Sequence, residues 1–377
     1  MSWSNVATLA GSVVLFIGFI SVAVLVMTYA ERKALARIQQ RIGPMRTGPF
    51  GILQPIADAL KLLSKEDLLP GRSDKVSFWL APMVVFVPAF MLWVTVPFTR
   101  DLVIRNLELG AFYFIAVSGV SVTGLLMAGW ASFNKYAMLG AARSAAQLIS
   151  YELPLIVSVI SVVMIAGTTD LTGIVLAQTG TWFIVLQPVA FTLFLLAGLA
   201  EVGRTPFDIP VAESELMGGP LIEYSGIRWS MFFFAEYANT LAIAVLATLL
   251  FLGGWRGPAP SSGWTEDLVH ALWMLVKVVG VTFVIFWIRA SSPRLRIDQL
   301  MALAWKLLLP LAFANIVLTG LYLFYDWPDW VIVVLSLAVL AASAALYYHR
   351  RRSQVLRPRT TRVRVEQGRI VGREQTA

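Results

Sequence analysis

Acidic side chains gather beside apolar runs in this sequence. The stretch AEVGRTPFDIPVAESELMGG follows directly on the run WFIVLQPVAFTLFLLAGL and holds four carboxylates, and three more lie in or beside neighbouring apolar segments. The seven residues are Glu152, Glu201, Asp208, Glu213, Glu215, Glu223 and Glu236. Two carboxylates about 5 Å apart at an effective dielectric constant of about 20 repel by roughly 3 kcal/mol, so neighbouring groups share and exchange protons. We therefore predict a proton relay or the entrance of a polar channel.

The elements that must position these acids are membrane helices. Of the 377 residues, 58% are hydrophobic and 14% are charged, and the mean hydropathy is +0.74. Apolar runs of about 20 residues recur, each long enough to cross ~30 Å of hydrocarbon. We predict an all-α polytopic bundle of about nine transmembrane helices. The expected spans are 6–29, 77–97, 111–130, 149–167, 182–200, 232–253, 268–289, 301–324 and 330–348.

Basic residues indicate how the bundle is oriented. Counted with Arg289 at the end of the seventh span, the segments after the first, third, fifth, seventh and ninth spans hold 25 of the 30 lysines and arginines. Because positively charged loops stay on the cytoplasmic side, we expect an outer N-terminus and a cytoplasmic C-terminus. Residues 1–348 then form one transmembrane domain, and 349–377 form a flexible basic tail that lies near anionic lipid and binds no nucleic acid.

This topology places the acids near one face of the membrane. Glu201 ends the fifth span, while Glu152 and Glu236 begin the fourth and sixth, all on the cytoplasmic side. Prolines and glycines between 206 and 220 interrupt any continuous helix there, although VAESELM is a good short helix. A carboxylate inside an apolar run is usually functional. For Asp208 and Glu223, a solvated loop position is an equally good interpretation.

Redox chemistry within this chain is disfavoured. The chain has no cysteine, which excludes disulfides, zinc thiolates and the usual thiolate-bound iron–sulfur clusters. Its two histidines, His270 and His349, are expected at opposite membrane faces, so a bis-histidine haem does not fit. We predict no bound cofactor, no metal site and no redox centre in this chain alone.

The segment after the first span predicts an interfacial amphipathic helix. Leu53, Ile56 and Leu60 fall on one helical face, while Asp58 and Lys61 fall on another. Beside the acidic segment, such a helix could cover a lateral opening through which an apolar molecule with a polar head enters from the lipid. Simple surface attachment with snorkelling lysines explains the pattern equally well.

Four segments together resemble a known family. They are ERKALARIQQRIGPMRTGPFGILQPIADALKLLSKE, GWASFNKYAMLGAARSAAQLISYELPL, AEVGRTPFDIPVAESELMGG with EYSGIRWSMFFFAEYAN, and IRASSPRLRIDQL. In this order they are similar to the signature segments of the family of respiratory complex I membrane subunits whose mitochondrial counterpart is subunit 1. They place the functional segments at 31–75, 131–152, 201–236 and 289–300. Members of that family carry no redox group, border the quinone chamber and anchor the hydrophilic arm.

The resemblance implies roles for matched residues only. The quinone entrance would be lined by Glu31, Arg32, Asp58, Lys61, Arg294 and Arg296. The seven acids named above would form the relay toward antiporter-like subunits. The resemblance further implies a quinone as substrate at a shared site, with NADH, FMN and iron–sulfur clusters in partner subunits. No catalytic residue is expected in this chain.

Some positions depart from the family pattern. Met45 replaces an asparagine, and the third span lacks a carboxylate that some relatives carry. With this resemblance, we predict a non-redox subunit of a proton-translocating NADH:quinone oxidoreductase in a bacterial plasma (inner) membrane, which forms the quinone chamber and couples quinone reduction to proton translocation. The alternatives are the equivalent subunit of a related membrane hydrogenase or other ferredoxin- or cofactor-linked complex, or a stand-alone ion transporter. A transporter would have helix breaks near the midplane, whereas the main break here lies at the inner boundary.

Overall fold

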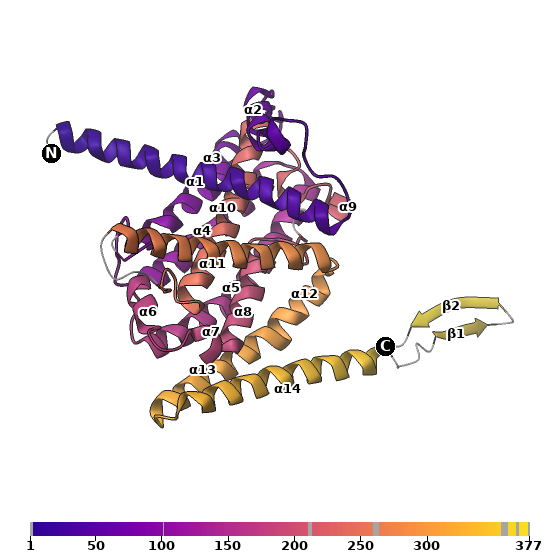
Figure 1. Cartoon of the computed structure of the whole chain (residues 1–377). Helices are drawn as coiled ribbons and strands as arrows, with labels where there is room; N and C mark the ends of the chain where they lie inside the picture. The colour runs from indigo at the N-terminus through magenta and orange to yellow at the C-terminus, as the bar shows by residue number, and fades with distance from the viewer. Residues whose placement is uncertain are drawn as a thin grey trace.

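The computed structural model describes residues 3–100, 102–209, 213–258, 264–355, 361–366 and 369–375. Long helices dominate the described part of the chain (Figure 1). In the first half they are α1 (Trp3–Ile38), η1 (Pro49–Gly51), α2 (Gln54–Ser64), α3 (Lys75–Met91), η2 (Leu92–Thr95), α4 (Gly110–Ala131), α5 (Lys135–Ala166), α6 (Leu171–Ala177) and α7 (Phe183–Leu186). The second half contains α8 (Pro188–Glu201), α9 (Glu213–Leu216), η3 (Gly219–Leu221), α10 (Gly226–Phe251), α11 (Trp264–Ser291), α12 (Ile297–Leu303), η4 (Ala304–Leu308), α13 (Leu309–Phe324) and α14 (Asp329–Val355).

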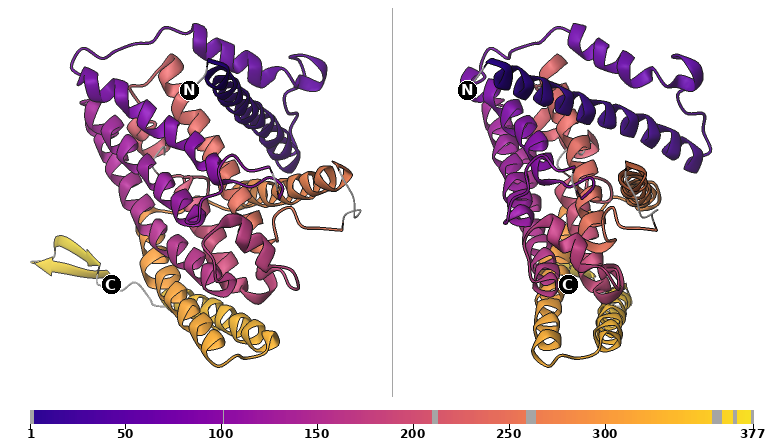
Figure 2. Two further views of the ribbon diagram at one scale, coloured as in Figure 1. Left: turned by 90° about the vertical axis from the view of Figure 1, so that its left-hand side faces the viewer. Right: turned by 60° about the vertical axis from the view of Figure 1, so that its left-hand side comes forward.

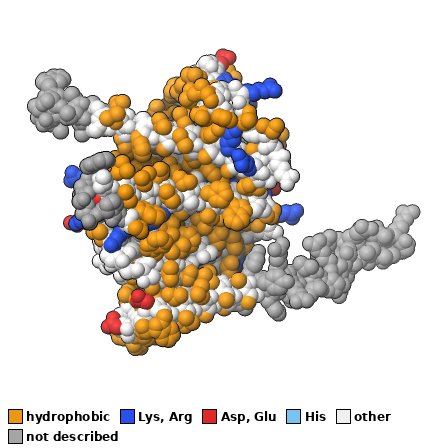
Figure 3. Space-filling model, viewed as in Figure 1, with side chains coloured by type: hydrophobic (Ala, Val, Ile, Leu, Met, Phe, Trp, Pro, Cys, Tyr) orange, Lys and Arg blue, Asp and Glu red, His pale blue; other side chains and the backbone are white. Residues whose placement is uncertain are grey.

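The predicted all-α membrane bundle is confirmed. Seven helical segments of the described residues are long and apolar enough to cross a membrane, and two shorter apolar helices, Pro188–Glu201 and Asp329–Ala345, stand where the fifth and ninth spans were expected. Hydrophobic side chains cover most of the face seen in Figure 3, and a few charged ones are scattered among them and along its margins. Such a surface suits contact with lipid or with other apolar subunits.

Two helices extend well beyond the boundaries expected from hydropathy. Helix α5 begins at Lys135 instead of 149, so Glu152 lies about 25 Å along a helix about 48 Å long, not in its first turns. Helix α1 continues to Ile38 instead of ending at 29, so Glu31 belongs to a helix and not to a loop. In both cases charged residues lower the local hydropathy without interrupting the helix, because alanine, leucine, lysine and arginine are all good helix formers.

Helix α10 lies at the centre of the bundle and α1 lies at its edge. In α10, 72% of the most apolar stretch is buried, against 22% in α1 and 28% in α11. Helices α3, α4 and α5 run side by side, while α1 and α11 stand apart from this group (Figure 2). The side chains of α10 are therefore enclosed mainly by protein.

The expected amphipathic helix is present as α2. Before it, the chain makes a tight turn in which Gly51 has φ +80°, and a Cβ at Gly51 would fall 2.3 Å from the Pro44 carbonyl oxygen. Only glycine fits so close an approach. Ile56, Leu60 and Leu63 of α2 remain exposed in the isolated chain, so lipid or a partner subunit must cover this face.

The end of the chain continues beyond the last span. Helix α14 extends to Val355, and β1 (Thr361–Glu366) pairs antiparallel with β2 (Arg369–Gln375). The start of α1 and the end of α14 lie at opposite sides of the bundle in Figure 1.

Candidate functional site: a buried ion-pair cluster and its neighbours

Four charged side chains from separate parts of the chain meet around two deeply buried ones, Glu31 and Arg204. Glu31 of α1 forms an ion pair with Arg289 of α11, and its Oε1 lies 3.6 Å from Arg204 Nη1. Arg204 follows the end of α8, and its Nε lies 3.0 Å from Oε1 of Glu236 on α10. We call Glu31, Arg204, Arg289 and Glu236 the buried cluster. It ties α1, α8, α10 and α11 together.

Exposure differs sharply within the buried cluster. The side chain of Glu31 is 2% exposed and that of Arg204 is 5% exposed, whereas that of Glu236 is 34% exposed. The Arg204 guanidinium also lies over the Tyr237 ring, 4.1 Å from its centre, which adds a cation–π contact. Carboxylates buried this deeply are tolerated only when paired, and Glu31 has both Arg204 and Arg289 as ion-pair partners. Glu236 is the member that water reaches most easily.

Asp208 and Arg294 extend the buried cluster toward the surface. Arg294 Nη2 lies 3.7 Å from Asp208 Oδ1 and also donates to the Asp208 carbonyl. Asp208 interacts electrostatically with Glu236. Arg296, two residues further on, is exposed at the start of α12, and its backbone N–H donates to Gln299 Oε1 at 3.4 Å. Arg294 thus joins the cluster, while Arg296 lies outside it.

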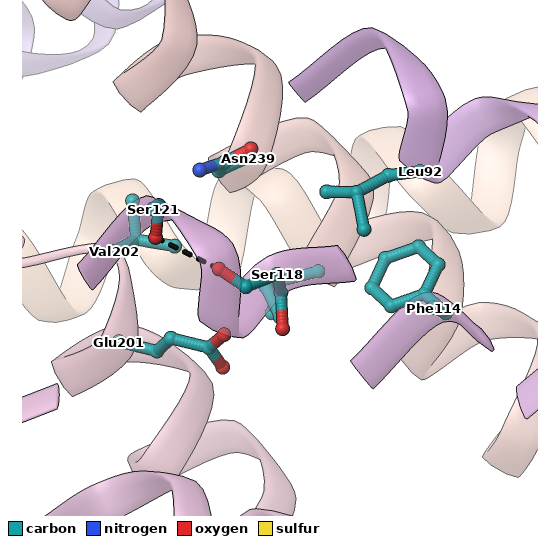
Figure 4. A pocket seen from close by; sticks show the side chains of 8 residues that line it. Leu92, Phe114, Ser118, Ser121, Glu201, Val202 and Asn239 are labelled. Carbon is teal, nitrogen blue, oxygen red and sulfur yellow. Dashed lines mark hydrogen bonds between the residues drawn. The ribbon is translucent and has the colours of Figure 1, made fainter. Parts of the chain in front are cut away.

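Glu152 and Glu201 form a second group against α4. They interact electrostatically with each other, and Ser118 of α4 is a neighbour of Glu201 (Figure 4). A Cβ at Gly119 would lie 2.7 Å from Glu152 Oε1, so the missing side chain leaves room for this carboxylate. Although α4 has no acid of its own, it contacts both glutamates through small residues.

The acids of the broken segment after α8 lie nearer the surface. The expected short helix is present as α9, and Glu215 Oε2 lies 2.8 Å from Arg143 Nη1 of α5. Glu223 Oε1 accepts from the side chain of Asn134 at 2.8 Å, at the start of α5. The side chain of Glu213 lies outside the described residues. The predicted gathering of acids is therefore divided between two buried groups and separate contacts on α5.

The charged face of α2 docks on α1. Arg32 Nη1 lies 2.5 Å from Asp58 Oδ2, and Gln54 donates to Asp58 Oδ1 at 3.1 Å. Lys61, one turn further along α2, is exposed and makes no ion pair with any described residue. Arg32 follows Glu31 directly, so the contact between α1 and α2 adjoins the buried cluster.

The far end of α2 is fastened to α10 by a second buried arginine. Arg228 is 3% exposed, and its Nε lies 3.0 Å from Asp67 Oδ2. Its guanidinium also lies 3.9 Å from the centre of the Trp79 ring. Ser225 adds hydrogen bonds to the backbone of residues 66 and 68. Contacts at both ends therefore hold α2 against the bundle.

Lys277 binds backbone carbonyl groups and none of these acids. Its Nζ donates to the carbonyls of Leu252, Gly254 and Arg256 at 2.7, 2.9 and 2.6 Å, and it lies 4.9 Å from the centre of the Trp182 ring. These carbonyls follow the end of α10, where the helix leaves acceptors unsatisfied. Lys277 thus joins α11 to the end of α10.

Sequence reasoning did not single out Arg204, Arg289 or Arg228. A signal for Arg204 was available, because it is the only cation in the broken acidic segment and buried carboxylates require a cationic partner. Arg289 and Arg228 carry no comparable local signal, since their partners Glu31 and Asp67 are distant in sequence.

Comparison with known proteins agrees with the expected resemblance. Residues 11–320 match the family described as NADH dehydrogenase. A subunit of the NADH-quinone oxidoreductase of Dehalococcoides mccartyi (strain CBDB1) is 46% identical over 337 residues, covering 89% of this chain and 93% of the relative. The subunit of the same name from Geobacillus kaustophilus is 49% identical over 319 residues, covering 84% of this chain and 95% of the relative. The similarity extends through all the segments that carry the buried cluster, and the chain belongs to the NADH dehydrogenase family.

Proposed function

We propose that this chain is the non-redox membrane subunit of a proton-translocating NADH:quinone oxidoreductase. It borders the quinone chamber, and it couples quinone reduction to proton translocation. The quinone is a substrate at a site shared with partner subunits, which hold the NADH site, FMN and iron–sulfur clusters. The names of the relatives support this function over a hydrogenase-type complex.

One observation carries the proposal. The buried cluster connects the side of the chain assigned to the quinone entrance, through Glu31, with the relay assigned to Glu236, and Arg204 contacts both carboxylates. A change in the charge of either carboxylate alters the field on the other, because both share one cation in a buried setting. Without electrons of its own, the chain can affect turnover only through such protonation, electrostatic or conformational changes.

The remaining residues receive roles in this proposal from their contacts. Arg32 and Asp58 hold α2 at the entrance, with Lys61 facing outward and Arg294 near the buried cluster. Glu152 and Glu201 continue the relay into the bundle, and Glu213, Glu215 and Glu223 form its outer part. The hydrophilic arm covers the cytoplasmic side, and the antiporter-like subunits receive the relay. The chain lies in the bacterial plasma membrane, with its N-terminus outside.

The test is Glu236→Gln in the assembled complex. The change keeps the shape of the side chain and removes its titration, so quinone reduction and proton translocation in sealed vesicles should fall together by about tenfold or more. NADH oxidation by an artificial hydrophilic acceptor should be unchanged, which reports intact assembly. Asp267→Asn, an exposed acid in the first turn of α11, is the matched control. Quinone reduction and proton translocation both at wild-type rates in Glu236→Gln would contradict the proposal.

A further inference from the structure

The chain that follows α2 meets the start of α10 in a closely packed joint. Gly226, the first residue of α10, has φ +54°, and a Cβ there would fall 3.1 Å from the Lys65 carbonyl oxygen. The Ser225 hydroxyl donates to the Glu66 carbonyl at 3.3 Å and accepts from the Leu68 amide at 3.0 Å. The two backbone segments therefore approach each other directly, which the glycine permits.

Arg228 is the charged centre of this joint. Its side chain is almost fully enclosed, and its Nε lies 3.0 Å from Asp67 Oδ2. The guanidinium also lies 3.9 Å from the centre of the Trp79 ring and 5.3 Å from that of the Phe78 ring, both on α3. The Phe78 ring in turn stacks on Tyr224 at 4.1 Å. One side chain of α10 therefore contacts both α3 and the segment that follows α2.

The two charged contacts of the α2 region differ in their exposure to water. In the pair that joins α2 to α1, the side chains of Arg32 and Asp58 are 41% and 26% exposed, so solvent and salt screen it. Arg228 is instead shielded, and its planar guanidinium contacts a carboxylate and an aromatic ring together. The joint at Arg228 therefore has the larger part in setting where α2 lies and where its exposed apolar face points.

We propose that Arg228 is a positioning residue for quinone binding, which acts by holding α2 in place through Asp67. A quinone that enters from the lipid passes α2 with its apolar tail, so the position of α2 affects how tightly a long-tailed quinone binds. Arg228 is itself enclosed by protein and takes no part in the reduction step. This inference rests on the proposed function, because α2 borders a quinone path only in that assignment.

The test compares two quinones with the same headgroup, one with a long isoprenoid tail and one with a single isoprene unit, on the assembled complex in proteoliposomes. Arg228→Lys keeps the charge but cannot contact Asp67 and cover the Trp79 ring together. It should raise the KM for the long-tailed quinone by about fivefold and leave kcat within about twofold. The KM for the short-tailed quinone should change by less than about twofold. Arg72→Lys, at an exposed arginine between α2 and α3, is the matched control and should keep both KM values.

A second variant covers the case in which Arg228→Lys does not assemble. Trp79 is 50% exposed, so Trp79→Leu is a mild change that removes the ring beneath the guanidinium and leaves the ion pair with Asp67. It should raise the same KM by about twofold to threefold, again for the long-tailed quinone alone. NADH oxidation by a hydrophilic acceptor reports the assembly of each variant. Equal KM changes for the two quinones, or wild-type KM values in the variants that assemble, would overturn the positioning role.

Glu236→Gln separates this inference from the proposed function. If Glu236→Gln lowers quinone reduction and proton translocation while the Arg228 and Trp79 variants keep wild-type KM values, only the positioning role fails. If Glu236→Gln leaves both rates at wild-type values, the proposed function fails, and the positioning role fails with it.

Discussion

The buried cluster and the pair between Arg143 and Glu215 are built from the same two kinds of side chain in very different surroundings. In the buried cluster, Glu31 is 2% exposed and shares Arg204 with Glu236. In the surface pair, the side chains are 30% and 56% exposed, and each has the other as its partner. Solvent and ions screen the surface pair, whereas a charge change in the cluster acts on every other member. Segments that look equally acidic in sequence thus differ in how much their protonation matters.

Replacing Arg204 is the strongest way to break this comparison. Arg204→Met leaves Glu31 and Glu236 without their shared cation, and removing one partner of a buried ion pair costs about 3–5 kcal/mol. The amount of assembled complex in membranes, measured on native gels, should fall severely, and any remaining complex should have little quinone reductase activity. Arg204→Lys keeps the charge but cannot reproduce the contacts of the planar guanidinium. Its assembly and its quinone reductase activity should therefore be intermediate between those of Arg204→Met and wild type. Wild-type assembly and turnover with Met at 204 would show that the cluster is dispensable.

Replacing Glu215 tests the surface pair of the comparison. Exposed ion pairs contribute about 0–1 kcal/mol, so Glu215→Gln should leave assembly intact and lower quinone reduction and proton translocation together by at most about threefold. The measurement is the ratio of each rate to that of Glu236→Gln in the same vesicles. A larger loss in Glu215→Gln than in Glu236→Gln would reverse the proposed ranking.

The smallest expected effect on activity comes from cysteines placed outside both regions. Gln39→Cys and Thr179→Cys alter exposed residues at the two expected membrane faces of a chain that has no natural cysteine, and neither should change turnover. In intact cells, an impermeant thiol reagent should label position 179 and not 39. The opposite labelling would invert the proposed orientation and the side on which α2 lies.

Sequence was sufficient for the features that depend on local composition. The apolar runs predicted the membrane helices, the prolines and glycines predicted the break after α8, and the periodicity between 53 and 63 predicted α2. The predicted start of the fourth span, at residue 149, was wrong. Lys135 and Arg143 lower the hydropathy of a stretch that nevertheless belongs to helix α5. Helix propensity and membrane hydropathy are different quantities, and in the first turns of α5 the helix propensity is high while the hydropathy is low.

Which charged residues pair with one another depends on the tertiary structure, so the sequence alone could not predict it. Glu31 and Glu236 were both expected at functional sites, but only the fold reveals that one arginine contacts both. A small cavity between α4, α8 and α10 was also inaccessible to the sequence alone, because the residues that line it come from separate helices.

The contacts of Lys277 have a mechanical consequence for the two helices that they join. Lys277, in the middle of α11, binds backbone carbonyls that follow the end of α10, whereas near the end of α11 Arg289 meets Glu31, which shares Arg204 with Glu236 of α10. Backbone carbonyls are neutral acceptors that carry no titratable proton, whereas the carboxyl groups of Glu31 and Glu236 can gain or lose one. Helix α11 is therefore held to α10 by two contacts of different chemistry, neutral carbonyl acceptors around Lys277 and paired carboxylates around Arg289. Because the two contacts lie about 18 Å apart along α11, weakening the second would leave the first as the point about which α11 turns relative to α10.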